Sequence, residues 1–150
     1  MLVFHNSNSL YEKPTHENII KNRQNHVNGV LGLWFAVNPK WIDSFGRNTY
    51  EITLDQNDVI VLPVDELFQW EKTANFLNNN KLIENKELEK EKYYLNLRES
   101  LLKQGTKAII FEENNNNKEM GIILDLKIIK KFQLIKNNEI KIKKKNKNML

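Results

Sequence analysis

The sequence predicts an α+β fold, in which antiparallel strands and helices occupy separate stretches of the chain. Strand-like segments come in neighbouring pairs, 48–54 with 58–63 and 106–113 with 119–135. A helix-rich stretch at 64–105 lies between these pairs. Hairpins with the helices gathered between them are typical of α+β domains and not of doubly wound parallel sheets.

The first part of the chain is expected to form two strands, each followed by a helix. Residues 1–5 are a short apolar strand, and Thr15 is a suitable N-cap for a helix over 15–24. The segment 31–37 is apolar without helical gaps, which indicates a buried strand. A second helix is expected over 38–46, because an Asn-Pro pair suits its start and a glycine its end.

The next two strands are expected to pair with each other. Residues 48–54 alternate between polar and apolar side chains, as the residues of a half-exposed strand do. A second strand-like run at 58–63 follows after a few residues. The short connection predicts a hairpin.

The remaining elements follow from periodicity and from breaker residues. An apolar stripe at helical spacing runs through 64–77, and 87–105 is a strongly amphipathic helix that ends at a glycine. A strand at 106–113 comes next, and 119–135 contains one or two more strands. The asparagine run at 114–117 is expected to be the tip of a hairpin.

Length and composition restrict the class of protein. A chain of 150 residues predicts one domain, and the absence of cysteine excludes disulfides and thiolate metal sites. No apolar run reaches ~18 residues, so we expect no membrane-spanning helix and no membrane partner. Residues 1–9 lack the basic and apolar regions of a signal peptide. We therefore expect a cytoplasmic protein, in the host cytoplasm if a phage encodes it.

The C-terminal end is strongly basic within a chain of formal net charge +4. We interpret 1–136 as a single domain and the lysine-rich segment 137–150 as a flexible tail. Such a tail attracts polyanions irrespective of their sequence, although a solvated chain end has the same composition.

Three features are candidates for chemistry. His5 lies at the end of the first strand, an aromatic stretch at 32–46 holds two of the three tryptophans, and Glu119 begins a strand after a polar loop. Taken singly, each has an ordinary explanation, as a structural histidine, a core segment and a solvated carboxylate. We expect no metal site.

Taken together and in order, these features resemble the motifs of the ADP-ribosyltransferase superfamily, of the poly(ADP-ribose) polymerase-like H-Y-E type that includes small phage and bacterial transferases. F-H-N-S at 4–7 stands in place of a strand that ends in H-G-[ST]. G-L-W-F-A at 32–36 is similar to a G-I-Y-F-A motif, and Phe45 lies eleven residues after Trp34, where the family has another aromatic residue. Glu119 corresponds to the glutamate that opens a later strand.

The resemblance implies a fold and an activity. The fold is a split β-sheet core with flanking helices, to which residues 64–95 add a helical insert. The activity is that of a mono-ADP-ribosyltransferase with NAD⁺ as its substrate, bound in a cleft between two small sheets. The bond between nicotinamide and ribose breaks, and ADP-ribose passes to a macromolecular acceptor, for which a protein is favoured over a nucleic acid.

The resemblance also implies roles for particular residues. Glu119 and His5 are the catalytic residues: Glu119 stabilises the cationic sugar carbon and His5 binds a ribose hydroxyl. Trp34 and Phe45 sandwich the nicotinamide, a flat cation that an aromatic face attracts. The residues implied in binding NAD⁺ are His5, Asn6, Ser7, Trp34, Phe35 and Phe45.

Departures from the family pattern leave alternatives open. Asn6 replaces a glycine and Trp34 replaces the usual tyrosine, so a catalytically inactive module of the same fold, which binds NAD, another nucleotide or a partner, is one alternative. A plain interaction protein that uses its basic tail is another. Glu112 and Glu113 precede the loop and compete with Glu119 for the role of the acid.

Overall fold

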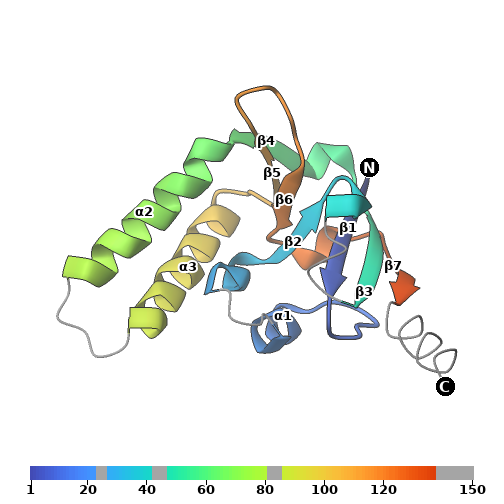
Figure 1. Ribbon diagram of the computed structural model, residues 1–150, viewed down its shortest axis with the longest axis horizontal. Coiled ribbons are helices and arrows are strands. Elements are labelled where there is room, and N and C mark those ends of the chain that lie inside the picture. Colours follow the sequence, from blue (N-terminus) through green and yellow to red (C-terminus); the bar gives the residue numbers. More distant parts are fainter. Residues whose placement is uncertain (23–26, 42–46, 81–85, 138–150) are drawn as a thin grey trace, which may run out of the picture.

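A seven-stranded sheet with helices packed on it forms the body of the computed structural model, which describes residues 1–22, 27–41, 47–80 and 86–137 (Figure 1). The mixture of strands and helices confirms the predicted α+β class. The strands are β1 (Leu2–Ser7), β2 (Leu33–Ala36), β3 (Asn48–Thr53), β4 (Val59–Pro63), β5 (Ala108–Glu112), β6 (Met120–Ile123) and β7 (Lys131–Asn137). The helices are α1 (His16–Asn22), α2 (Val64–Asn80) and α3 (Lys86–Lys103), with the 3₁₀ helices η1 (Val27–Leu31), η2 (Pro39–Trp41), η3 (Gln56–Asp58) and η4 (Leu126–Ile128).

The sheet consists of two halves between which the backbone ladder is short. Its strand order is β4-β5-β6-β2-β1-β3-β7. Within one half, β1 and β3 pair along their whole length, from Leu2 opposite Thr53 to Ser7 opposite Asn48. Between β1 and β2 the ladder has a single pair, Phe4 opposite Ala36. We call this boundary between β1 and β2 the seam.

The predicted hairpin between 48–54 and 58–63 is wrong. β3 pairs with β1 on one side and with β7 on the other, so it has no free edge for β4. β4 instead lies at the opposite edge of the sheet and pairs in parallel with β5. The turn between them is built by η3, whose N-cap Asp55 accepts a hydrogen bond from the Asn57 backbone at 2.9 Å. A capped helical turn redirects the chain, whereas a two-residue hairpin would have returned it alongside β3.

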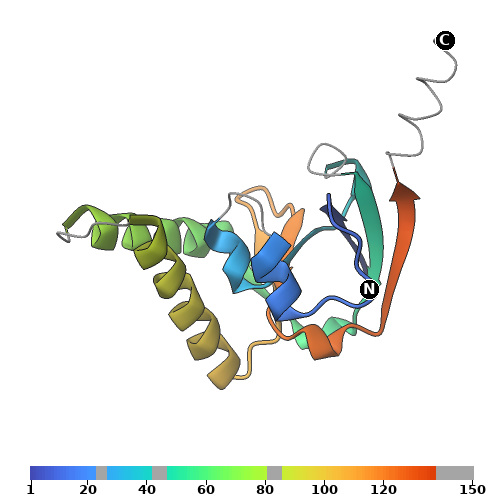
Figure 2. The same cartoon turned by 90° about the horizontal axis from the view of Figure 1, so that it is seen from below.

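Two apolar clusters cover the two faces of the sheet. Neighbouring strand residues point to opposite faces, and Ile122 and Ile123 fall into different clusters. The Val3 cluster contains Val3, Ile19, Leu33, Phe35, Ile52, Leu54, Ala108, Ile110 and Ile123, with η4 packed against it. The Tyr94 cluster contains Val30, Leu31, Ala74, Tyr94, Ile109, Phe111, Ile122 and Leu124 and lies under α2 and α3. Figures 1 and 2 both show α2 and α3 beside the β5–β6–β2 half, away from β3 and β7.

The other expected elements are mostly present. The Thr15 side chain caps α1 by accepting a hydrogen bond from the Asn18 backbone at 3.2 Å. The β5–β6 hairpin forms as predicted, and Gly105 has φ 83° just after α3. Of the helix expected over 38–46, the structure describes only η2, and residues 42–46 lie outside the described part, as do 138–150 of the predicted tail. No helix in the described ranges is both long and apolar enough to cross a bilayer.

Candidate functional site

His5 lies on β1 beside the seam, and its imidazole is bonded to the other half of the sheet. The ring nitrogen Nδ1 lies 2.6 Å from the carbonyl oxygen of Trp34. A carbonyl oxygen only accepts hydrogen bonds, so Nδ1 carries the hydrogen. Burial lowers the pKa of His5 from 6.5 to about 4, against the opposing effect of the bond to Trp34. At neutral pH the ring is therefore uncharged, and its other nitrogen, Nε2, is a hydrogen-bond acceptor.

An aromatic group surrounds His5 on its own half of the sheet. Tyr50 faces His5 across the β1–β3 ladder, with ring centroids 6.5 Å apart, and Tyr11 lies 6.4 Å from the imidazole. The Tyr50 hydroxyl donates to the Ser9 carbonyl at 3.1 Å and accepts from the Tyr11 backbone at 2.8 Å. Tyr50 thereby anchors the loop after β1 next to the imidazole. This contact is not apparent from the sequence, which does not reveal that β1 and β3 are neighbours.

Trp34 contributes its backbone to His5 and its ring to the core. The indole stacks on Phe111, with centroids 6.1 Å apart and planes 21° apart, and its Nε1–H donates to the Asn28 carbonyl at 3.1 Å. The ring thus packs against the Tyr94 cluster. His5 lies two residues after Val3 and shares its face of the strand. The Trp34 ring and the His5 ring therefore lie on opposite faces of the sheet.

Glu119 lies on the same face of the sheet as His5. Its carbonyl accepts a hydrogen bond from the Val37 backbone at 2.9 Å, which extends the ladder between β2 and β6 by one residue. Alternation from Ile123, a member of the Val3 cluster, places the Glu119 side chain on the face that carries Val3 and His5. The side chain is half-buried, and it makes no hydrogen bond or ion pair with another described residue.

Asn6 and Ser7 are buried and already hydrogen-bonded. The Asn6 amide donates to the Thr49 hydroxyl at 2.9 Å, while its carbonyl oxygen is buried without a partner among the described residues. The Ser7 hydroxyl accepts from the Ser9 backbone at 3.1 Å. The Asn6 side chain therefore ties β1 to β3, and the Ser7 side chain supports the turn at the end of β1.

The other two residues implied in binding NAD⁺ differ in what the structure says of them. Phe35 is a core residue of the Val3 cluster, only 2% exposed. Its ring lies over Gly121 of β6, where an added Cβ would stand 2.2 Å from the ring. Phe45 lies outside the described residues, so its predicted place opposite Trp34 stays a prediction.

Two side chains that the sequence did not single out hold the chain where it enters β2. The Arg98 guanidinium on α3 donates to the Leu31 carbonyl at 2.7 Å. The His16 ring on α1 donates through Nε2 to the Val30 carbonyl, also at 2.7 Å. Both carbonyls belong to η1, which comes directly before β2. These two residues therefore position Trp34 and the seam from the helical side.

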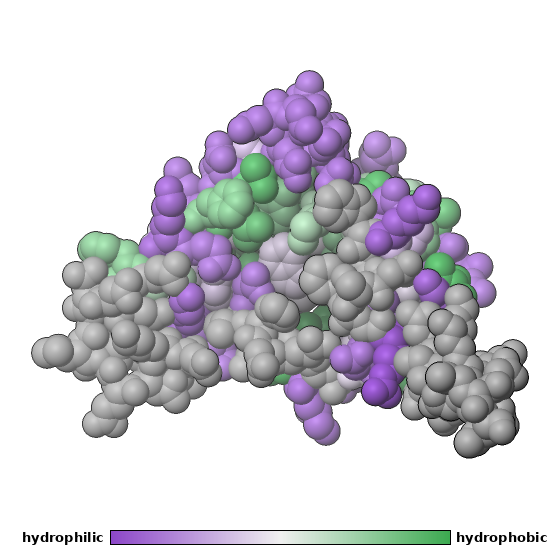
Figure 3. Space-filling view, in the orientation of Figure 1, coloured by the Kyte–Doolittle hydropathy of each residue, from purple (hydrophilic) through white to green (hydrophobic). Residues whose placement is uncertain are grey.

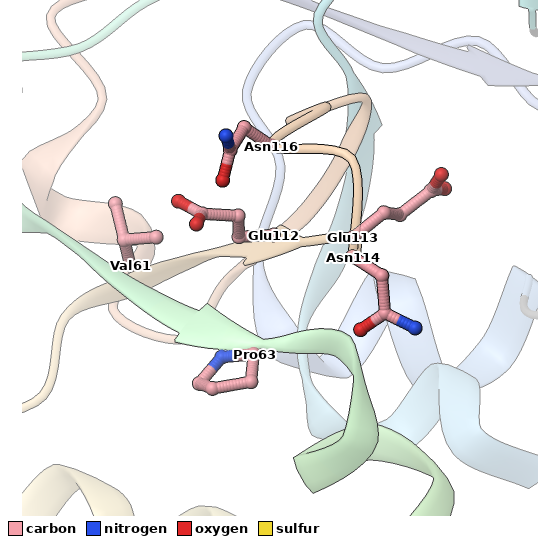
Figure 4. Close-up of a pocket in the computed structure, with 6 residues that line it drawn as sticks. All are labelled: Val61, Pro63, Glu112, Glu113, Asn114 and Asn116. Atoms are coloured by element: carbon pink, nitrogen blue, oxygen red, sulfur yellow. The ribbon is translucent and has the colours of Figure 1, made fainter.

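Glu112 and Glu113, the competing acids, lie at the end of β5, one strand further from His5 than Glu119. They line a hollow beside β4 together with residues of the β5–β6 loop (Figure 4). Glu112 also lies 3.6 Å from the Lys118 ammonium group. Both acids are separated from His5 by β6 and β2, but continuation of the β5–β6 register beyond its last pair places Glu112 beside Glu119 on the same face of the sheet.

The site offers an uncharged acceptor nitrogen and a carboxylate on one face of the sheet, on either side of the seam. Such a pair suits a hydroxyl-bearing ligand on which positive charge develops. In the ranges that the structure describes, no three His, Cys, Asp or Glu side chains gather as metal ligands do. No family model, curated protein or solved structure matches this chain.

Proposed function

We propose that this chain is an NAD⁺-dependent mono-ADP-ribosyltransferase. One observation carries the proposal: the strand order β6-β2-β1 brings the strands of Glu119 and His5, distant in the sequence, to the two sides of β2. Both side chains then point to the same face, as alternation along the strands requires. The motif resemblance supplies the reaction, and this arrangement supports it.

The neutral His5 ring suits this chemistry. When the bond between nicotinamide and ribose breaks, the bonding electrons leave with nicotinamide and the sugar carbon becomes cationic. An uncharged imidazole accepts a hydrogen bond from a ribose hydroxyl through Nε2 without placing a positive charge beside that cation. The Glu119 carboxylate stabilises the cation as it forms. A nucleophile of the acceptor then bonds to the sugar carbon and loses its proton.

The Trp34 ring does not lie on the face of the sheet that carries His5. That ring is stacked on Phe111 on the other face of the sheet. On the face of His5, the half-buried Tyr11 ring lies 6.4 Å from the imidazole. The proposal therefore relies on His5 and Glu119 and not on Trp34.

The test is release of nicotinamide from NAD⁺, measured by chromatography. We expect the parent chain to release nicotinamide and Glu119→Gln to do so at least about 100-fold more slowly, the scale of losing one stabilising group in such a site. Glu113→Gln is the matched control, because it removes a nearby carboxylate on the other side of the loop and should retain the parent rate. Full turnover in Glu119→Gln would reject the assigned role.

The acceptor is proposed to be a cytoplasmic protein, as for a phage or bacterial effector. Incubation of the chain with labelled NAD⁺ and a bacterial lysate should transfer label to protein bands, and mass spectrometry then identifies the modified residue. Label in the nucleic-acid fraction instead would keep the transferase and overturn the protein acceptor.

A catalytically inactive module is the second candidate. It is favoured by Asn6 in the glycine position and by the packing of the Trp34 ring. Titration calorimetry with NAD⁺ distinguishes the two, because binding without nicotinamide release is expected of the module alone. Absence of any NAD⁺ binding would reject the transferase and a module that binds NAD⁺.

A further inference from the structure

The two edges of the sheet differ in chemistry. The edge strand β7 has the sequence KFQLIKN and carries two lysines. The opposite edge strand β4 has the sequence VIVLP and carries no charged residue. Proteins commonly protect edge strands with charged residues, because an open edge invites pairing with another strand. β4 lacks that protection, apart from Pro63 at its end.

β4 also exposes apolar surface. Ile60 is 42% exposed and Val61 48% exposed. Neighbouring strand residues point to opposite faces, so apolar surface is available above and below the edge. Among the described residues, no strand pairs with the outer side of β4.

A hollow of about 470 Å³ lies beside this edge. Figure 4 shows Val61 and Glu112 on the same side of their strands, with Asn116 of the β5–β6 loop directed towards Glu112. The remaining lining residues are Pro63, Glu113 and Asn114. In Figure 3 hydrophilic side chains gather at the top of the molecule, where Figure 1 places the β5–β6 loop, and apolar surface lies directly beneath them. The hollow thus combines the apolar Val61 and Pro63 with a polar rim formed by Glu112, Glu113, Asn114 and Asn116.

The charge of the rim is opposite to that of the whole chain. Glu112 and Glu113 are acidic, and α2 begins directly after β4 with Asp65 and Glu66 in its first turn. Lys118 neutralises part of this charge, at 3.6 Å from Glu112. The formal net charge of the chain is +4, so general electrostatics would favour an acidic partner. A preference for a basic partner can arise only from this local arrangement.

We propose that the outer edge of β4 and this hollow bind an extended, lysine- or arginine-bearing segment of a partner protein as an additional strand. The backbone of the segment pairs with β4, its apolar side chains cover Val61, and a basic side chain lies opposite Glu112 and Glu113. Pairing of an extended peptide with an open sheet edge is a general mode of recognition, in which alternate side chains give the selectivity. The proposal does not depend on NAD⁺ turnover.

The test is fluorescence anisotropy with two labelled short peptides, one alternating lysine and valine and the other alternating glutamate and valine. The full chain should bind the lysine peptide saturably and the glutamate peptide at least about tenfold more weakly. Equal binding of the two peptides, or preference for the glutamate peptide, would overturn the proposal.

Two pairs of variants locate the site. Val61→Lys places a charge on the β4 edge, and Ile135→Lys is its control on the β7 edge, where Ile135 is 47% exposed. The double variant Glu112→Gln/Glu113→Gln removes the rim charge, and Glu99→Gln on α3 is its control. The β4 and rim variants should bind the lysine peptide about tenfold more weakly, with the controls unchanged. Equal losses of affinity in the variants and in their controls would refute this location. Dimerisation of the chain in sedimentation experiments, abolished by Val61→Lys, would also refute it, because β4 would then pair with a second copy.

Discussion

The imidazole of His5 donates a 2.6 Å hydrogen bond to the carbonyl oxygen of Trp34, and this bond crosses the seam between the two halves of the sheet. It fixes the tautomer of the ring and uses the backbone of Trp34, whose side chain lies on the other face. The sequence suggested His5 and Trp34 as two ligand-binding side chains. In the structure, the side chain of His5 is bonded to the main chain of Trp34.

The stability of the fold should fall as pH decreases from about 6.5 towards 4. The pKa of His5 is 6.5 in the unfolded chain and about 4 in the folded protein, so between these values the unfolded state binds more protons. The loss amounts to as much as about 3 kcal/mol. Burial lowers the pKa of His16 as well, which acts in the same direction.

Urea unfolding at several pH values measures this effect. In His5→Gln the decrease between pH 6.5 and 4 should be clearly smaller than in the parent chain, because the titrating group is gone. His16→Gln serves as the comparison and should remove a separate part of the decrease. An unaltered pH dependence in His5→Gln would show that the ring is accessible to protons in the folded state.

Removing the Trp34 ring should destabilise the fold irrespective of any ligand. Trp34→Ala should lower the free energy of unfolding by about 2–4 kcal/mol, because the indole stacks on Phe111 and bonds the Asn28 carbonyl. Trp34→Phe retains a stacked ring and should lose only about 1 kcal/mol for the hydrogen bond. Urea unfolding of both variants makes the comparison. If Trp34→Ala were as stable as the parent, the ring would not be part of the core.

Tyr50→Phe should loosen the loop after β1. The hydroxyl makes two hydrogen bonds with that loop, so its removal should lower the free energy of unfolding by about 1–2 kcal/mol. Tyr93→Phe is a matched control on α3 and should change it by no more than about 0.5 kcal/mol. Limited proteolysis should cleave near Tyr11 faster in Tyr50→Phe alone. Equal behaviour of the two variants would contradict the anchoring role.

Two glycines should respond differently to alanine. At Gly32, just before β2, an added Cβ would stand 2.1 Å from the Ile123 carbonyl oxygen, and backbone on both strands would have to move. Gly32→Ala should therefore cost at least about 3 kcal/mol. Gly105 has φ 83° and open space around it, so Gly105→Ala should cost only about 1–2 kcal/mol for the left-handed backbone. Thermal unfolding ranks the two, and the reverse order would contradict the close approach of β2 and β6.

Local sequence signals predicted the helices and strands themselves better than they predicted which strands pair in space. The Thr15 cap, the apolar run of β2 and the glycine after α3 each depend on a few adjacent residues, and all three expectations are confirmed. The hairpin of β3 with β4 was wrong because pairing depends on distant strands. β1 and β7 occupy both edges of β3, and nothing within 48–63 reveals them.

The same limit applies to the candidate site. Residues 31–37 are apolar without interruption, so the sequence did not show on which face the Trp34 ring lies. The face follows from the residues that each ring packs against. The Trp34 ring stacks on Phe111, and Gly121, which has no side chain, leaves space for the Phe35 ring on the other face. The neutral state of His5 likewise depends on burial that the long-range packing of the strands produces, against the opposing effect of the bond to the Trp34 carbonyl.

With a single residue pair, Phe4 with Ala36, the seam has the shortest backbone ladder of the interior strand boundaries. Spreading β1 from β2 breaks far fewer backbone contacts than peeling β1 from β3, where six residues of each strand are aligned. Amide protons along this line should exchange with deuterium through local breathing, well before either half unfolds. Such an opening also separates the apolar side chains that the two halves contribute to the Val3 cluster, so it is limited by the core as well as by the ladder.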